Sequence, residues 1–375
     1  MLLQEAGLLE NDPIQLRPSK VIACPEPSSR ERFKAYLRKI GSGTETSRGM
    51  DREEAAAALQ MILKAEASPA QIGAFLIAHR IRRPEPQELA GMLDTYAALG
   101  PQVRSGDGQR KPLCFGVPFD GRTRTAPIYP LTALVLLSAG QPVVLQGGAR
   151  MPVKYGITTH ELFKALGLDL TGLSINQVEA GFQQHGLALI HQPDHFPLAE
   201  SLISYREDIG KRPPIASLEL MWTAHQGKHL IVAGFVHPPT ESRAWKALEI
   251  YGETDLFTVK GLEGSTDLPI SRPCILGKVQ ANSPERLVLH PRDHGCIGKD
   301  VSWSELEGWR DQALAAIHNQ GPLRQALIWN AGIYLWLSEL AKTIEQGMAQ
   351  AEAALESGAS QKMLDELISW RQNLD

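Results

Sequence analysis

The residues of this chain whose types and spacing best fit ligand chemistry lie in the segment 113–125. An apolar run there leads into a turn in which Gly116, Asp120 and Gly121 take the places expected in a loop that cradles phosphate. Such a loop normally uses glycines, because they reach positive φ and let backbone amides close on phosphate oxygens. Residues 117–119 are instead valine, proline and phenylalanine, and proline has no N–H to donate. The sequence therefore predicts a phosphate-binding scaffold with an altered floor.

Basic side chains are concentrated around this turn. Residues 101–154 contain seven basic and two acidic side chains, whereas the whole chain of 375 residues has a net charge of -4. We expect this segment to face an anion, and solvation of single arginines and lysines in loops is the open alternative. The seven basic residues are Arg104, Arg110, Lys111, Arg122, Arg124, Arg150 and Lys154.

The composition, with 43% hydrophobic and 21% charged residues, is typical of a globular protein long enough for two domains. The most apolar stretch, residues 131–139, is too short to cross a bilayer, and residues 1–11 lack the basic start of a secretory signal. The scattered cysteines indicate reduced thiols. We therefore expect a cytoplasmic protein with no membrane partner. The cysteines are Cys24, Cys114, Cys274 and Cys296.

Two sets of elements must position these residues. Residues 1–28, which contain four prolines, predict an extended lead-in. Residues 29–100 predict a small domain of four helices with apolar residues at helical spacing. These helices are expected over 33–40, from Asp51 with Glu54 completing a capping box, from Ser68 as cap with Pro69 in the first turn, and over 89–96.

Beyond residue 100, apolar strands alternate with helices, which predicts an α/β domain over 101–375 with a mostly parallel sheet flanked by helices. The helices near 175–202 are alternative members of the helical domain. The stripe Trp329, Ile333 and Trp336 predicts a buried helix face. Strands are expected over 113–115, 142–146, 187–191, 229–236, 256–260 and 286–290, and helices over 129–139, 159–166, 175–185, 243–251 and from 304 onward.

Two separated segments resemble one family. Residues 50–80 look like the helical N-terminal domain of anthranilate phosphoribosyltransferases and pyrimidine nucleoside phosphorylases, the glycosyltransferase family 3 group. Residues 327–358 are similar to the closing helices of that group. The resemblance implies the same fold class and the transfer of a phosphoribosyl group from phosphoribosyl pyrophosphate to an aromatic amine, as in tryptophan biosynthesis.

The donor-site motifs of the family are kept in part. Its Gly-Thr-Gly-Gly-Asp-Gly loop, which holds pyrophosphate, matches residues 116–121. Its Lys-His-Gly-Asn-Arg motif matches residues 146–150, where Gln146 replaces a lysine whose point charge suits phosphate. Its Ser-Ser-Lys-x-Gly element matches residues 152–156 and keeps the lysine. The resemblance implies a donor site lined by Gly116, Asp120, Gly121, Arg122, Arg124, Thr125, Thr132, Gly148, Arg150 and Lys154.

The family's metal and acceptor sites are altered as well. Its Asp-Glu pair, which binds Mg²⁺ on the pyrophosphate, falls at Thr266 and Asp267, so the resemblance implies a weakened Mg²⁺ site with Asp267 and Glu263 as ligands. Its arginine that binds anthranilate matches Arg206, whose guanidinium suits a carboxylate. Pairing of Arg206 with neighbouring acidic residues is the open alternative.

This altered pattern resembles a subgroup of second paralogues, some of which bind nucleic acid instead of serving tryptophan synthesis. The resemblance implies a homodimer joined through the helical domain, with the basic residues of 101–154 contacting DNA or RNA phosphates without reading bases. Three functions therefore stay open: ordinary transfer to anthranilate, transfer to another acceptor, and non-catalytic binding of nucleic acid. In an enzyme, Arg122 and Arg124 would replace the amide donor that Pro118 lacks.

Overall fold

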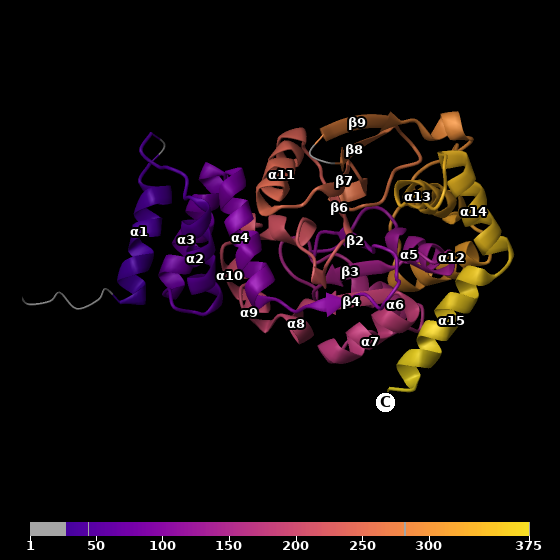
Figure 1. Ribbon diagram of the computed structural model, residues 1–375, viewed down its shortest axis with the longest axis horizontal. Coiled ribbons are helices and arrows are strands. Elements are labelled where there is room, and N and C mark those ends of the chain that lie inside the picture. The colour runs from indigo at the N-terminus through magenta and orange to yellow at the C-terminus, as the bar shows by residue number, and fades with distance from the viewer. Residues whose placement is uncertain (1–27, 44, 281–282, 375) are drawn as a thin grey trace, which may run out of the picture.

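The computed structural model describes residues 28–43, 45–280 and 283–374, and it places a helical bundle beside a larger α/β domain (Figure 1). The predicted fold class is confirmed, and the predicted lead-in over 1–28 lies outside the described residues except for Ser28. Among the described residues, no helix is both long and apolar enough to cross a membrane.

The bundle forms where helix-starting signals stand in the sequence. The predicted capping box of Asp51 and Glu54 is present, and Ser68 caps its helix with Gln71. Close approach of two helices depends on Gly91, since a Cβ there would lie 2.0 Å from the Arg52 carbonyl oxygen. The four helices are α1 (Ser29–Gly41), α2 (Arg52–Leu63), α3 (Pro69–Arg82) and α4 (Pro86–Leu99).

A seven-stranded sheet in the order β4-β3-β2-β6-β7-β8-β9 forms the centre of the α/β domain. Its first five strands are parallel and almost fully buried, as expected for strands covered on both faces. They are β2 (Leu113–Gly116), β3 (Val143–Gly147), β4 (Leu187–His191), β6 (Leu230–Gly234) and β7 (Asp255–Val259). The antiparallel strands β8 (Cys274–Gln280) and β9 (Ser283–Leu289) complete it, and β1 (Val103–Arg104) pairs separately with β5 (His225–Gln226).

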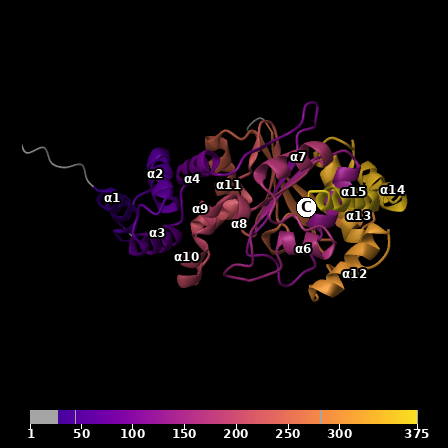
Figure 2. The same cartoon turned by 90° about the horizontal axis from the view of Figure 1, so that it is seen from below.

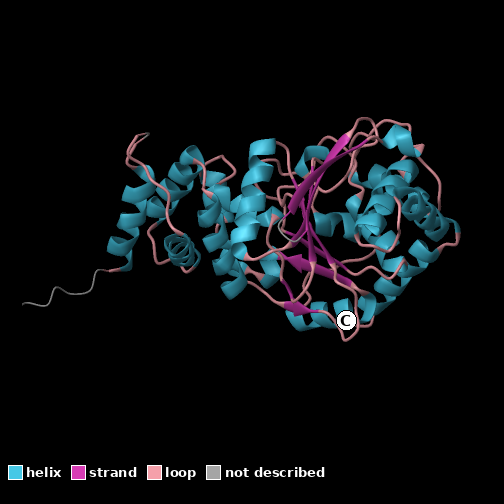
Figure 3. Ribbon diagram, turned by 45° about the horizontal axis from the view of Figure 1, so that its top comes forward, coloured by secondary structure: helices cyan, strands magenta, loops and turns pink. Residues whose placement is uncertain are grey.

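Helices lie on both sides of this sheet (Figure 3). Trp329 and Ile333 are fully buried in α13, which confirms the predicted core stripe there, whereas Trp336 is partly exposed. The helix α14 crosses α13 so closely that a Cβ on Gly347 would lie 2.2 Å from the Gly332 carbonyl oxygen. The longer helices are α5 (Tyr129–Ser138), α6 (Thr159–Ala165), α7 (Ile175–His185), α11 (Pro238–Tyr251), α12 (Leu306–Ile317), α13 (Arg324–Leu337), α14 (Ile344–Glu356) and α15 (Ala359–Gln372).

Short helices connect the bundle to the α/β domain (Figure 2). The Tyr96 ring of α4 packs against Phe196 and Trp222, with ring centroids 5.0 and 5.6 Å apart. The segment 192–208 therefore lies beside the bundle, while α7 packs on β4. The short elements are α8 (Gln192–His195), α9 (Pro197–Glu200), α10 (Ile203–Asp208) and the 3-10 helices η1 (Pro214–Leu220), η2 (Leu262–Gly264) and η3 (Pro291–His294).

The described cysteines Cys114, Cys274 and Cys296 are free and buried, which agrees with the expected reduced thiols; Cys24 lies outside the described residues. Burial raises the pKa of the Cys114 and Cys274 thiols to about 12, so neither is a nucleophile near neutral pH.

Candidate functional site

The turn after β2 is closely packed and does not form an open loop that could cradle a phosphate. A Cβ on Gly116 would lie 2.0 Å from the Leu220 carbonyl oxygen, so only glycine lets β2 approach η1 this closely. Val117 and Phe119 are buried, and the Phe119 amide donates to Glu219 Oε2 at 3.0 Å. The altered residues therefore direct a backbone donor to an internal carboxylate.

Asp120 and Arg206 belong to a buried ion-pair network. Asp120 is fully buried, accepts a hydrogen bond from Arg212 and lies 3.6 Å from Arg206 Nη2. Arg206, on α10, also donates to Glu219 at 2.6 Å and is 3% exposed. Burial raises the pKa of Glu219, and the Arg206 charge opposes that shift. Arg206, expected to bind an acceptor carboxylate, is engaged by carboxylates of its own chain.

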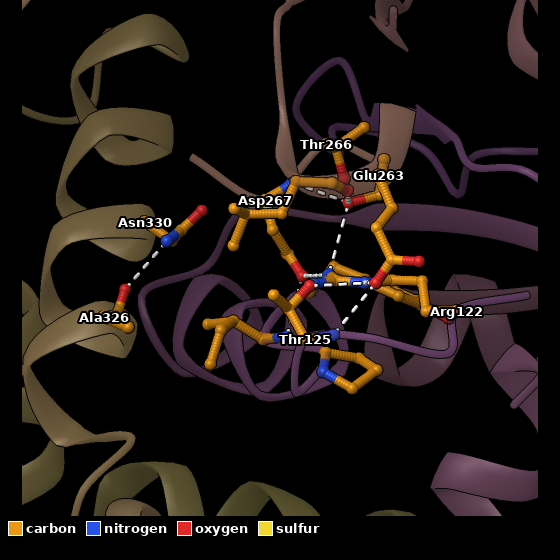
Figure 4. A network of polar contacts seen from close by, with 12 residues as sticks. Arg122, Thr125, Glu263, Thr266, Asp267, Ala326 and Asn330 are labelled. Atoms are coloured by element: carbon orange, nitrogen blue, oxygen red, sulfur yellow. Dashed lines mark hydrogen bonds and ion pairs between the residues drawn. The ribbon is translucent and has the colours of Figure 1, made fainter. Parts of the chain in front are cut away.

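Arg122 turns inward from the loop and joins the two residues expected to hold a metal (Figure 4). Its guanidinium donates to Asp267, to Thr125 Oγ1 and, at 3.3 Å, to Ser265 Oγ, and its Nε lies 3.7 Å from Glu263 Oε1. The Arg122 side chain is 3% exposed. It is therefore an internal cation and does not project into solvent.

Glu263 lies at the centre of the same network. Its carboxylate accepts hydrogen bonds from the amides of Thr123, Arg124 and Thr125 at 3.3, 3.0 and 2.9 Å, and from the Thr125 hydroxyl at 3.0 Å. Lys154 Nζ and Arg124 Nε each lie 3.6 Å from it. Burial acts to raise the pKa of Glu263, but the three amide hydrogen bonds and Arg122 lower it to about 2.

The backbone around Glu263 is fixed from both sides. Glu263 has φ 56° and ψ 21°, a left-handed conformation that is uncommon for a residue with a side chain. On the other side of the loop, Asn330 of α13 accepts from the Leu268 amide at 2.7 Å and donates to the Leu268 carbonyl at 3.0 Å. These contacts anchor the carboxylates against the carboxyl end of the sheet.

The expected Mg²⁺ ligands do not fit a magnesium ion in this arrangement. Mg²⁺ requires six oxygen ligands in octahedral geometry. The Asp267 carboxylate already accepts hydrogen bonds from Arg122 and, at 2.8 Å, from the Ile128 amide. The Glu263 carboxylate is likewise occupied by contacts with backbone amides and cations. Thr266, which replaces a carboxylate, is buried with its hydroxyl unpartnered. No group of three or more metal-ligating side chains occurs among the described residues.

The remaining predicted donor-site residues are dispersed or engaged. Gly121 (φ 75°) packs on Gly156, and its carbonyl lies 3.4 Å from Lys154 Nζ. Arg150, 54% exposed, pairs with Glu161 at 2.8 Å. Three further residues of these motifs are buried. Thr132 is buried in α5 without a hydroxyl partner, Gly148 packs on Met151, and Gln146 donates to the carbonyls of Glu219 and Trp222 at 3.0 and 2.6 Å.

The basic segment 101–154 does not form a single surface. Arg110 and Lys111 precede β2, where Arg110 donates to the Ser338 carbonyl at 2.9 Å and Lys111 pairs with Asp255 at 3.4 Å. Arg122 and Arg124 follow β2. The two pairs therefore lie at opposite ends of the central strand β2, so the basic residues of this segment are divided within one chain.

The structure adds a basic cleft that the sequence reasoning missed. It has a volume of about 930 Å³ and lies between the end of α3, η1, the loop after β6 and η2. Four arginines line it: Arg80, Arg83, Arg212 and Arg243. Arg80, Arg83 and Arg243 make no ion pair with a carboxylate in the part of the chain that the structure describes. The signal in the sequence was the run of three arginines within residues 80–83.

The fold and the domain matches define the class of this protein. The sequence matches the helical bundle domain of the Glycosyl transferase family over residues 34–100 and the a/b domain of that family over residues 122–361. Because the second match covers more than half of the chain, the chain belongs to this glycosyl transferase family. Within the family it is an anthranilate phosphoribosyltransferase-like protein.

Curated relatives agree with this assignment. An anthranilate phosphoribosyltransferase of Chromobacterium violaceum is 25% identical and is aligned over 86% of this chain and 94% of its own length. One from Afipia carboxidovorans is 26% identical over 90% and 98%.

Two solved structures share the fold. The anthranilate phosphoribosyltransferase of Thermus thermophilus has a TM-score of 0.76 at 19% identity, covering 92% of this chain and 100% of that one. The Saccharomyces cerevisiae enzyme in complex with PRPP and Mg has a TM-score of 0.74 at 13% identity, covering 91% and 98%.

Proposed function

We propose that this chain uses the phosphoribosyltransferase scaffold to bind nucleic acid and does not perform ordinary magnesium-dependent transfer to anthranilate. The observation that carries the proposal is the charge balance of the cleft. Arg80, Arg83 and Arg243 have no carboxylate partner among the described residues, whereas its three glutamates are each paired internally. Glu219 pairs with Arg206, Glu241 with Arg286 and Glu263 with Arg122. The cleft therefore offers cations without competing free anions.

Phosphate contacts by such arginines bind the nucleic-acid backbone irrespective of sequence, because binding releases condensed counterions. Arg80 and Arg83 are exposed on the bundle, and Arg243 is half-buried on α11 of the α/β domain. A nucleic-acid strand lying across the cleft would thus contact both domains.

Ordinary transfer is disfavoured by the donor side of the site. The Phe119 amide already donates its hydrogen bond to Glu219, and Pro118 has no N–H to donate. Catalysis of this kind requires positioned cations on the departing pyrophosphate. In this chain Arg122 takes the position between Asp267 and Glu263, where the expected metal would be held.

Nucleic-acid binding is tested by fluorescence anisotropy with labelled duplex and single-stranded oligonucleotides at several salt concentrations. Arg83→Ala and Arg243→Ala should each weaken binding and lower the salt slope by about 0.7 to 0.9, the loss of one phosphate contact. The control Arg310→Ala removes a half-buried arginine of α12 outside the cleft and should leave both quantities unchanged. A salt-independent affinity, or equal effects of all three variants, contradicts the proposal.

A second candidate is phosphoribosyl transfer to another acceptor. It is favoured by the retained Gly116, Asp120, Gly121 and Lys154, and by the family membership. A yeast structural neighbour is described in complex with PRPP and Mg, and another with 4-fluoroanthranilate. Calorimetric titration of phosphoribosyl pyrophosphate with Mg²⁺ tests this candidate: binding heat supports it, and no heat at millimolar ligand removes it.

We also propose a homodimer joined through the helical bundle, as the resemblance implies. Two copies would bring two clefts into one assembly and lengthen the cationic surface that a nucleic-acid strand can contact. Light scattering during size-exclusion chromatography gives the mass directly, and a mass of 41.1 kDa at all concentrations contradicts the dimer.

A further inference from the structure

Four polar side chains form a chain of hydrogen bonds at the amino end of the parallel sheet. Ser105 Oγ lies 2.9 Å from His225 Nε2, and His225 Nδ1 lies 3.4 Å from His229 Nδ1. His229 Nε2 in turn lies 3.1 Å from Glu253 Oε1. His229 comes directly before β6 and Glu253 two residues before β7, whereas the loop after β2 and η2 lie at the carboxyl end of the strands. None of these four residues lines the cleft.

Glu253 sets the direction of the hydrogen bonds along this chain. An ionised carboxylate only accepts, so a neutral His229 ring donates through Nε2 and accepts at Nδ1. His225 then donates through Nδ1, and its Nε2 is left to accept from the Ser105 hydroxyl. Burial lowers the pKa of His225 to about 4, and His229 adds to this shift, so the His225 ring is neutral near pH 7. The Ser105 hydroxyl therefore donates to an unprotonated ring nitrogen.

Neighbouring contacts hold Ser105 and His225 against each other. Ser105 directly follows β1, which pairs in parallel with β5, the strand that carries His225. The His225 ring is 4% exposed and packs edge-on against Phe182, with ring centroids 5.8 Å apart. On the Ser105 side, Gln109 accepts from the Gly106 amide at 2.8 Å and donates to the Phe182 carbonyl at 3.0 Å. The hydroxyl and the ring are thus positioned by the fold on both sides.

The turn that carries Ser105 is open to solvent. Ser105 is partly exposed, and the neighbouring residues Asp107 and Gly108 are exposed. A Cβ on Gly108 would meet no atom within 4 Å, so there is free space beside this turn. A small reactant in solution can therefore approach the Ser105 side of the hydrogen-bonded chain, while His225 is covered.

We propose that Ser105 is a nucleophile toward small activated acyl esters, with His225 as its general base. His229 and Glu253 act as positioning residues. A serine hydroxyl within hydrogen-bond reach of a base that a third group orients is the arrangement of an activated nucleophile. This proposal does not depend on nucleic-acid binding, because it uses none of the cleft residues.

The proposed step transfers the acyl group from the ester to Ser105. The Ser105 oxygen forms a bond to the ester carbonyl carbon while its proton passes to His225 Nε2. The bond between that carbon and the leaving oxygen then breaks, and the leaving alcohol takes up the proton from His225. During the step the negative charge of Glu253, acting through His229, balances the positive charge on the His225 ring.

The test is reaction of the full-length protein with p-nitrophenyl acetate, followed by release of p-nitrophenol and by peptide mass spectrometry that locates the acetyl group. We expect the wild-type protein to carry an acetyl group on Ser105, and Ser105→Ala to lose it. His225→Ala should slow acetylation of Ser105 by about 100-fold, the usual contribution of a general base. Added imidazole should restore part of that rate, which it would not do if the His225 ring only supported the fold.

Variants of Glu253 separate its charge from its shape. Glu253→Gln should slow acetylation of Ser105 by about tenfold or more, because a neutral amide cannot balance the charge on the ring. Glu253→Asp keeps the carboxylate and should recover part of this loss. Equal rates for Glu253→Gln and wild type would remove Glu253 from the proposed step.

The matched control is Ser201→Ala. Ser201 is exposed, and its hydroxyl donates to the Leu198 carbonyl at 2.7 Å instead of to a histidine. Its loss should leave the acetylation of Ser105 unchanged. The proposal is overturned if the wild-type protein carries no acetyl group on Ser105, or if folded His225→Ala is acetylated there at the wild-type rate. The wild-type result requires no variant to fold, and neither outcome bears on the binding of oligonucleotides.

Discussion

At the scale of single residues, Arg122 decides how the donor loop is used. A guanidinium donates several directed hydrogen bonds to the buried carboxylates beside it. Without it, a hydrated metal ion would have to make these contacts. Asp267 is 1% exposed, and burial raises its pKa, while Arg122 opposes that shift. The loop is therefore held closed by charge neutralisation inside the chain.

Removing this cation should be costly. Arg122→Ala leaves the buried Asp267 without its charge partner, and we expect the free energy of unfolding to fall by about 3 to 5 kcal/mol. Arg124→Ala is the matched control, because Arg124 is mostly exposed and should lose less than about 1 kcal/mol. Urea denaturation measures both. Equal losses in the free energy of unfolding would mean that the buried Arg122 ion pair stabilises the protein no more than the exposed Arg124 side chain does.

The sequence predicted which residues lie together at this site, but it did not predict the contacts that they make. Asp120, Gly121, Arg122, Arg124, Thr125 and Lys154 were expected near one another, as were Glu263 and Asp267, and the structure places them together. The inward turn of Arg122 could not be predicted, because buried and solvated arginines look alike in a sequence. Their difference arises from carboxylates about 140 positions away in the chain.

At the scale of elements, glycines set how closely helices pack. Gly347 of α14 meets the Gly332 backbone of α13, whereas a Cβ on Gly73 of α3 would meet no atom within 4 Å beyond the adjoining backbone of its own helix. One glycine is needed for contact, and the other only adds backbone freedom to the unfolded chain.

Alanine substitution should separate these two roles. Gly347→Ala forces α13 and α14 apart and should destabilise the protein by about 1 to 3 kcal/mol. Gly73→Ala should stabilise it by about 0.5 to 1 kcal/mol through helix propensity. Thermal and chemical denaturation report both signs, and destabilisation by Gly73→Ala would refute the comparison.

Local signals explain which elements were predicted. Capping boxes at Asp51 and Ser68 and apolar runs such as residues 113–115 depend on neighbours in sequence, and these elements are confirmed. The strand β8 was missed, because Gly277 and Lys278 interrupt its apolar pattern. Its pairing with β7 and β9 is a tertiary effect.

At the scale of the whole molecule, the bundle is fastened to the α/β domain at the end of α11, a helix whose first residues line the cleft. Arg52 of α2 binds Asp94 of α4 through two hydrogen bonds of 2.6 and 2.7 Å and donates to the Ile250 carbonyl of α11 at 2.7 Å. A cleft built from both domains keeps its shape only while this junction holds.

Weakening the junction should loosen it locally. Arg52→Ala should speed hydrogen exchange in α4 and in the last turn of α11, while the amides of β3 keep their protection. The control Lys34→Ala removes an exposed ion pair with Glu31 inside α1 and should change neither region. Exchange followed by mass spectrometry distinguishes these outcomes, and uniform acceleration across the sheet would indicate global destabilisation instead.

The strand β9 has a consequence for how the protein behaves in a crowded solution. It ends the sheet, and its outer edge pairs with no other strand among the described residues. An unpaired edge is a template for aggregation between chains. Pro284 lacks an N–H there, and Glu285 and Arg286 are exposed charges that oppose the approach of a second strand. The edge thus carries its own protection against fibrous self-association.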